Sequence, residues 1–296
     1  MPDIVIRPEI EQANVAALRD AYGKMQNFVG NDNRSWIYWG ETHGFNRYDC
    51  WHHAVVGPGR GTQFTYDLFL PWHRAYLASF EHIVREQNPD ALLPWWDWTS
   101  AAAHDHGIAA SYSDPDANGE TNPLASGPTP DMPDDPARRT RRFTGDPSEL
   151  PSMTDARPDL GLNLSVNDIL DLPQFTDFTS QIQNVHDYIH GWTGGTDDNG
   201  VGGDMGVVPT SAFDPIFWSH HAMIDRLWYL WQLKWGVTNV PPNYLDKTLA
   251  PFSYTVRDVL DLHTLGYDYA TGTATATAAT GTTAKAPPGT QKADNG

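Results

Sequence analysis

Cysteine, basic residues and long apolar runs are all scarce in this 296-residue sequence. Cys50 is the single cysteine, so no disulfide can form within the chain. No apolar run reaches the roughly 20 residues that cross a bilayer, and residues 1–7 lack the basic start and apolar stretch of a signal peptide. We therefore expect no membrane partner, and a protein that is either cytoplasmic or exported without a signal peptide of its own.

The shortage of basic residues limits the range of partners. The chain has 19 Lys and Arg against 37 Asp and Glu, which gives a formal net charge of -18. A surface this acidic repels phosphate backbones, so we expect no nucleic-acid partner. In contrast, the 40% hydrophobic content, with 12 Trp, 12 Tyr and 11 Phe, is enough for one large core that could line a buried site.

Apolar residues at intervals of three and four predict most of the secondary structure. The predicted helices cover residues 9–28, 67–87, 165–170, 174–192 and 213–235. Residues 101–159 are rich in Pro, Asp, Gly and Ser and predict a long loop, whereas the Thr- and Ala-rich residues 270–296 predict a flexible tail. The fold class is therefore mainly α, with long loops and few short strands, in one domain over residues 1–269.

Two of the 12 histidines have a spacing that suits a metal ion. A lone histidine is usually a surface residue or a hydrogen-bonded core residue. His186 and His190 are four residues apart in a predicted helix, so both imidazoles lie on one face and can bind one ion. Zinc hydrolases with this spacing have Glu directly after the first histidine, where this chain has Asp187. A zinc protein is thereby disfavoured, but it stays an alternative.

Two longer segments carry a resemblance to a known family. Residues 69–81 (Phe-Leu-Pro-Trp-His-Arg-Ala-Tyr-Leu-Ala-Ser-Phe-Glu) and residues 214–226 (Asp-Pro-Ile-Phe-Trp-Ser-His-His-Ala-Met-Ile-Asp-Arg) resemble the two copper-binding signatures of the tyrosinase family. That family also includes catechol oxidases, o-aminophenol oxidases and hemocyanins. Shorter matches lie at residues 94–98, 190–195 and 204–206. The resemblance extends over nearly the whole chain before the tail.

The resemblance implies a four-helix-bundle core that holds two copper ions, each bound by three histidines. The implied ligands are His43, His52 and His73 for copper A and His186, His190 and His221 for copper B. An inserted loop over residues 55–66 stretches the spacing before His73, which leaves His53 as a rival to His52. Cys50 stands where many family members bond a cysteine sulfur covalently to the middle histidine.

Six neutral imidazoles suit copper that moves between Cu(I) and Cu(II). The resemblance implies that two Cu(I) ions reduce O2 to a side-on peroxide. This species would then convert o-diphenols, and monophenols where a base is available, to o-quinones. The expected partners are O2 and small phenols. A hemocyanin-like O2-binding protein and an o-aminophenol oxidase remain alternatives.

Four positions near the copper B ligands are candidates for handling the phenol. Relatives with strong monophenol activity often have Asn after the first copper B ligand, together with a nearby Glu, and here these positions are Asp187 and Gln183. Asp187 is therefore either the base that takes the phenol proton or a supporting residue with no proton role. Gly191 and Val208 are expected at the mouth of the substrate pocket.

The resemblance also gives expectations for residues behind the ligands. Phe217 is expected either to stack on a ligand ring or to pack in the core. Asp225, Glu81 and Asp97 are expected either to orient ligand rings through their second nitrogen or to form buried ion pairs with arginines. His220 is expected to pack beside the site without binding metal.

The end of the predicted domain resembles the end of the family's catalytic core. Residues 267–269 (Tyr-Asp-Tyr) match its closing motif, and Arg7 matches the arginine that packs on this motif through a cation–π contact. A lid domain can follow in relatives, whereas only the tail follows here. This predicts a site that is open or is covered by a lost or separate cap domain.

Overall fold

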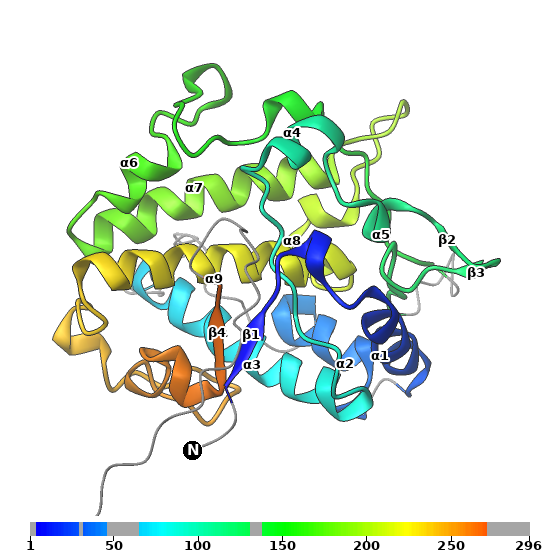
Figure 1. The fold of residues 1–296 in the computed structure, drawn as a ribbon, viewed down its shortest axis with the longest axis horizontal. Coiled ribbons are helices and arrows are strands. Elements are labelled where there is room, and N and C mark those ends of the chain that lie inside the picture. The colour runs from blue at the N-terminus through cyan, green and yellow to red at the C-terminus, as the bar shows by residue number, and fades with distance from the viewer. Residues whose placement is uncertain (1–3, 30–31, 46–64, 131–137, 271–296) are drawn as a thin grey trace, which may run out of the picture.

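The structure is a computed structural model, and it describes residues 4–29, 32–45, 65–130 and 138–270 (Figure 1). Cys50, His52 and His53 lie outside the described residues, and so does the predicted tail after residue 270. In the described part, helices dominate and strands are few and short, which confirms the mainly α prediction. None of these helices is both long and apolar enough to span a bilayer.

Nine α-helices lie within the described ranges. They are α1 (Val15–Asn27), α2 (Trp36–Gly40), α3 (Thr65–Gln87), α4 (Ala101–His106), α5 (Ala110–Ser113), α6 (Val166–Leu170), α7 (Phe175–Gly194), α8 (Val208–Ser211) and α9 (Pro215–Trp235). A π-helix, η2 (Glu41–Phe45), follows α2 directly. Short 3₁₀ helices occur at η1 (Ile10–Gln12), η3 (Pro147–Glu149), η4 (Pro158–Leu160), η5 (Asp204–Gly206), η6 (Pro242–Tyr244), η7 (Arg257–Val259) and η8 (Leu262–Leu265).

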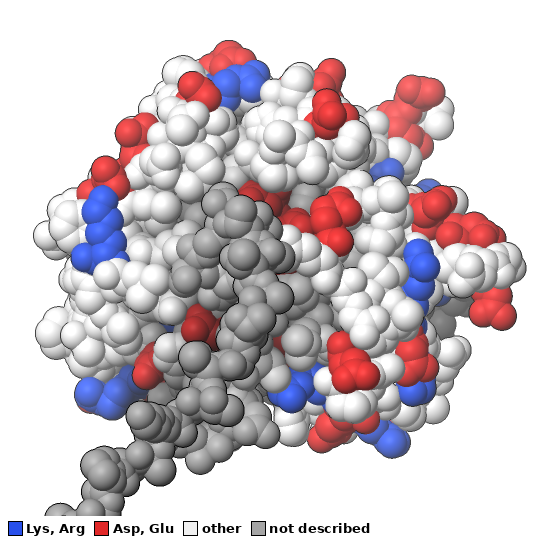
Figure 2. All heavy atoms as spheres, viewed as in Figure 1, with Lys and Arg blue, Asp and Glu red and all other residues white. Residues whose placement is uncertain are grey.

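Four short strands complete the described fold. Strands β1 (Val5–Arg7) and β4 (Tyr267–Tyr269) pair in parallel, so segments more than 250 residues apart in the sequence lie side by side. Strands β2 (Asp116–Ala117) and β3 (Glu120–Thr121) form a small antiparallel hairpin. Figure 2 shows acidic side chains scattered over one face of the molecule, with fewer basic ones between them.

The core lies where α3, α7 and α9 pack against one another, with α1 on the outer side of α3 (Figure 1). Helix α9 is buried on nearly all sides, which explains its almost continuous apolar sequence. Aromatic rings fill the space between α3 and α9, and Phe80 stacks on Trp218 with ring planes only 9° apart. This packing fixes the histidine-bearing faces of α3 and α9 relative to each other.

The predicted helices and loop differ from the structure at particular residues. The predicted helix over residues 9–28 is interrupted, because Ala13 ends η1 with an extended backbone and the Asn14 side chain caps α1 through the backbone N–H of Ala17. Helix α6 begins with a capping box of Ser165 and Asp168, at the start of the helix predicted over residues 165–170. The predicted loop over residues 101–159 was wrong in part, because it contains α4, α5 and the β2–β3 hairpin.

A buried ion-pair network ties β1 and β4 to α3 and α9. The Arg7 guanidinium lies 3.5 Å over the ring of Tyr267, so the predicted cation–π contact is present. Arg7 also pairs with Glu81 of α3 at 2.8 Å. Asp225 of α9 accepts hydrogen bonds from Tyr267 and Tyr269, both at 2.7 Å. These contacts join α3 and α9 through β1 and β4.

Candidate metal centre

Five of the six predicted copper ligands lie in the described residues, and the fold brings all five together. His43 is in η2, His73 in α3, His186 and His190 in α7, and His221 in α9. All are buried except His190, which is partly exposed. The ligand atoms of His43, His73 and His221 lie within 4.8 Å of one another, and so do those of His186, His190, His220 and His221. The sixth predicted ligand, His52, lies outside the described residues.

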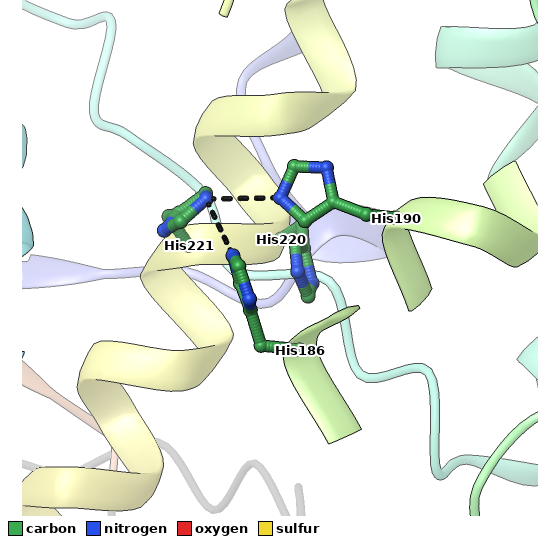
Figure 3. Close-up of side chains that lie close together, drawn as sticks. All are labelled: His186, His190, His220 and His221. Atoms are coloured by element: carbon green, nitrogen blue, oxygen red, sulfur yellow. Dashed lines mark hydrogen bonds between the residues drawn. The ribbon is translucent and has the colours of Figure 1, made fainter. Parts of the chain in front are cut away.

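Each long helix presents its histidines for a local reason. The four-residue interval puts His186 and His190 one above the other on the face of α7 that meets α9 (Figure 3). His221 lies opposite them, with its Nε2 atom 3.3 Å from Nε2 of His186 and 3.2 Å from Nε2 of His190. Four ligands that surround one ion at 2.0–2.1 Å are about 3.3 Å apart in tetrahedral geometry. The distances from His221 to His186 and to His190 therefore already match the spacing of a metal site.

One short segment orients a histidine in each group. Nδ1 of His190 lies 2.7 Å from the carbonyl oxygen of Met205 in η5, and Nδ1 of His43 lies 3.2 Å from the carbonyl oxygen of Val208 in α8. A carbonyl oxygen only accepts, so each Nδ1 must be the protonated donor. The lone pair of each ring is then on Nε2, which is the atom directed toward the other histidines.

The remaining oriented ligands use a helix carbonyl and a carboxylate. Nδ1 of His73 donates to the carbonyl oxygen of Phe69, one turn earlier in α3, at 2.8 Å. Nδ1 of His186 lies 2.8 Å from Oδ1 of Asp187. Both contacts again place the lone pair on Nε2. Such acceptors hold the ring plane and the tautomer before any metal binds.

Burial keeps the rings of His43, His190 and His221 neutral. Loss of solvent lowers the pKa of His43 and of His221 well below the usual 6.5, and the neighbouring His73 lowers both further. Burial also lowers the pKa of His190, although its contact with Met205 opposes this shift. A neutral imidazole offers a lone pair to a metal at neutral pH, so the site is ready for an ion without first losing a proton.

The predicted phenol-handling residues lie beside the copper B histidines. Asp187 is half exposed on α7 and directs one carboxylate oxygen at His186. Gln183 is fully buried one turn earlier, and its amide donates to the carbonyl oxygen of Thr179 at 3.3 Å. At Gly191, an added Cβ would meet no atom of the described structure within 4 Å. Val208 exposes its side chain by 48%, while its carbonyl group holds His43.

Phe217 lies against two ligand rings. Its ring centroid is 4.2 Å from that of His221, one turn later in α9, and 4.7 Å from that of His43. Phe217 is fully buried, so it packs in the core and against the ligands at the same time. It therefore fills the space between the two histidine groups.

The three carboxylates predicted behind the ligands make their contacts elsewhere in the described structure. Asp225 accepts a hydrogen bond from Nε of Arg74 at 2.5 Å. It also accepts from the hydroxyl groups of Tyr267 and Tyr269. Glu81 binds Arg7 and accepts from the backbone N–H of Leu93 at 2.9 Å. Asp97 accepts from the backbone and hydroxyl of Thr99. Asp225 and Glu81 thus form buried ion pairs with arginines, which is one of the two roles expected for them.

Sequence reasoning missed the residues that carry the orienting carbonyl groups. Met205 lies in the matched segment Asp204–Gly206, yet a backbone acceptor has no residue identity that a motif could reveal. The anchor of this turn was also missed: Asp204 is buried, pairs with Arg138 at 2.6 Å and accepts from the backbone N–H of Arg141 at 2.8 Å. A buried acid next to a motif is the signal that could have pointed to it.

Comparison with known proteins decides the family. The family model described as the common central domain of tyrosinase matches residues 30–234. The chain belongs to the tyrosinase family. It is 31% identical over 238 residues to a tyrosinase of Streptomyces lincolnensis, covering 74% of this chain and 84% of that one. It is 30% identical to the tyrosinase HcTyr1 of a Hahella species, covering 88% of this chain but only 61% of the relative.

Solved structures give the same fold. The tyrosinase of Burkholderia thailandensis superposes with a TM-score of 0.69 at 22% identity, covering 92% of this chain and 74% of that one. Hemocyanins are also related: the G-type hemocyanin of Enteroctopus dofleini is 32% identical over 55% of this chain and 6% of its own length. The cofactor of this family is a pair of copper ions, and the buried, neutral imidazoles described above fit it.

Proposed function

We propose that this protein is a copper oxidase that uses O2 to convert o-diphenols, and also monophenols, to o-quinones. The observation that carries the proposal is the convergence of His43, His73, His186, His190 and His221, whose oriented rings direct Nε2 lone pairs into one buried region. Membership of the tyrosinase family supports the same conclusion. The catalytic domain is proposed to be residues 1–269.

The ligand set that we propose keeps three histidines for each ion. His43, His52 and His73 hold copper A, and His186, His190 and His221 hold copper B. His53 is the rival to His52, and Cys50 is the proposed partner in a thioether with the middle histidine. Intact mass after copper loading tests that link, because forming the bond removes two hydrogen atoms.

The two copper ions, when bound, carry electrons from the phenol to O2. The protein holds the ligand rings in one tautomer, through Met205, Val208, Phe69 and Asp187, so that no ring must turn when the oxidation state changes. Phe217 and the surrounding aromatic core keep bulk water from the space between the histidine groups. The chain thus supplies a largely buried site with fixed donors.

Asp187 is the proposed base for the phenol proton. One of its oxygens holds His186, and because the side chain is half exposed, the carboxylate is also open to a phenol or a bridging water. Gln183, buried one turn earlier, takes the place of the Glu found in relatives and is proposed to support this proton transfer. Asp187 would therefore both orient a ligand and accept a proton.

Gly191 and Val208 are the proposed borders of the substrate entrance. The open space around Gly191 leaves room for a phenol ring beside His190. The exposed Val208 side chain offers an apolar surface beside His43. Small neutral phenols fit such an entrance better than carboxylated ones, because the net charge of -18 repels anions.

Two neighbouring functions are separated by one experiment. The relation to hemocyanins favours an O2-binding protein as the second candidate, and an o-aminophenol oxidase would use the same ligands. The test is a panel of mono-, di- and aminophenols given to the copper-loaded protein. Quinone formation from catechol supports the proposal. Reversible O2 binding without consumption of catechol would favour the carrier instead.

A further inference from the structure

A fourth histidine faces the copper B group. Helix α9 carries two consecutive histidines, and both His220 and His221 lie next to His186 and His190 (Figure 3). One ring nitrogen from each of these four residues lies within 4.8 Å of the others. The proposed copper ligands use only three of them, so the position of His220 is not explained by the proposed function.

Packing alone does not explain an imidazole at this position. His220 is fully buried, and within the described residues neither of its ring nitrogens has a hydrogen bond of ordinary geometry. Burying polar atoms without partners is costly. A phenylalanine would stack on His186 equally well and would carry no such cost.

The ring of His220 is already placed for a shared ion. It lies parallel to the ring of His186, with centroids 5.2 Å apart and planes at 17°, and edge-on to His190 at 5.0 Å. Nε2 of His221 already lies at nearly tetrahedral spacing from Nε2 of His186 and from Nε2 of His190. For a tetrahedral ion, the His220 nitrogen must close from at most 4.8 Å to roughly 3.3 Å from the other three nitrogens.

The position of His221 between the two histidine groups gives a reason for a fourth ligand. Its ring stacks on His73 with centroids 4.4 Å apart, and its ligand atom also belongs to the group of His43 and His73. His221 thus lies between both groups while the protein holds no metal. If His220 also binds, the first ion to enter stays with His186, His190 and His221. It does not move to the group of His43 and His73.

We propose that His220 is a fourth metal ligand, and that the first ion to enter the metal-free protein is held by His186, His190, His220 and His221. Four neutral imidazoles in tetrahedral geometry suit a closed-shell ion such as Cu(I) or Zn(II). His220 is released once the second ion binds and the proposed three-histidine copper B set is complete. The inference rests on the proposed function only for the identity of the resident metal.

The test counts the ligating histidines directly. Metal-free, full-length protein labelled with nitrogen-15 in its histidines receives one equivalent of cadmium-113, a closed-shell probe. Each bound ring nitrogen then shows a one-bond coupling to cadmium. Four coupled histidines are expected, and a count of three overturns the proposal whatever the affinity.

A variant identifies the fourth ligand. His220→Phe keeps the ring volume and the stacking on His186, and we expect it to weaken binding of the first cadmium equivalent by about tenfold or more in competition with a chelator. His263→Phe, which alters a half-exposed histidine paired with Asp268, is the matched control and should bind as the wild type does. Unchanged affinity in His220→Phe overturns the assignment of His220.

The outcomes separate the inference from the proposed function. If His220→Phe does not fold, the number of coupled histidines in the wild-type protein decides alone. The cadmium experiments need no oxidase activity, so they can succeed while catechol oxidation fails. Equally, quinone formation by the copper-loaded wild type can be observed while cadmium shows only three ligands.

Discussion

Nδ1 of His190 donates a hydrogen bond to the carbonyl oxygen of Met205 at 2.7 Å. Three residues after Met205, the carbonyl oxygen of Val208 accepts a hydrogen bond from Nδ1 of His43. One segment therefore orients a ligand in each of the two histidine groups. That segment is anchored by Asp204, through its ion pair with Arg138 and the backbone of Arg141. The two proposed copper sites therefore share one support outside the ligand set.

Asp204→Asn is expected to weaken metal binding at both sites. The loss of the charged partner of Arg138 loosens the turn that carries the two carbonyl groups, and such outer contacts are worth about 10- to 100-fold in metal affinity. Metal content after dialysis against a chelator measures this. Asp214→Asn is the matched control, because Asp214 is equally buried and pairs with Arg142. We expect this control to lose stability but to keep both ions; if Asp204→Asn also keeps both ions, the turn is not a shared support.

Asp187→Asn is expected to lower monophenol hydroxylation more than diphenol oxidation. An amide oxygen can still hold Nδ1 of His186, but it cannot take the phenol proton, and a positioned base contributes about 100-fold or more. The ratio of the two initial rates is the measurement. Adding Gln183→Glu to this variant places the acid at position 183 and the amide at position 187, the reverse of the wild type. This double variant should recover part of the ratio. An unchanged ratio in Asp187→Asn would remove the base role.

The metal-free protein is expected to lose stability as the pH falls below about 6.5. Burial lowers the pKa of His43, His190, His220 and His221 in the folded state, whereas these side chains take up protons near their usual pKa of 6.5 in the unfolded chain. Stability is therefore fully present above this pH and falls below it, by up to about 1.4 kcal/mol per pH unit for each histidine. Urea unfolding at about pH 7.5 and 5.5 measures the slope.

A variant pair assigns this slope to the buried site. His220→Gln removes one buried imidazole and should flatten the pH dependence, whereas His82→Gln, on the exposed surface of α3, should leave it unchanged. A metal-free protein that is equally stable at both pH values would contradict the account of buried neutral rings.

Gly191→Leu is expected to exclude bulky phenols while leaving copper binding and catechol oxidation largely intact. A side chain at this position meets no atom of the described structure within 4 Å, so it extends into open space beside His190. Relative kcat/KM for catechol and for a larger diphenol measures the effect. Gly194→Ala is the contrasting variant, because its Cβ would lie 2.3 Å from the backbone nitrogen of Gly206 and must displace the turn. Equal loss for both phenols in Gly191→Leu would argue against an entrance here.

Sequence patterns located the long helices and most of the histidines because both depend on short-range spacing. The four-residue interval of His186 and His190 predicts a shared face without any knowledge of the fold. Short helices such as α4 depend on local capping, here by Ser100, that the composition of residues 101–159 obscured. The period of apolar residues likewise did not show that the predicted first helix breaks at Asn14.

The supporting contacts were beyond sequence reasoning for a different reason. The carbonyl groups of Met205 and Val208 orient histidines through atoms that every residue possesses. The sequence allowed two roles for Asp225. Its actual partners include Arg7 and Tyr269, which are distant in the chain. The parallel pairing of β1 and β4 brings these two residues to Asp225. Tertiary structure is needed to decide between such roles.

The most direct test of the central claim is a combined measurement of bound copper, O2 uptake and quinone formation with catechol. The account predicts two copper ions per chain, with one O2 consumed for every two molecules of o-quinone formed, and loss of the activity when His73 or His221 is replaced. A protein that binds two zinc ions in preference to copper, and that consumes neither O2 nor catechol when copper is supplied, would contradict it.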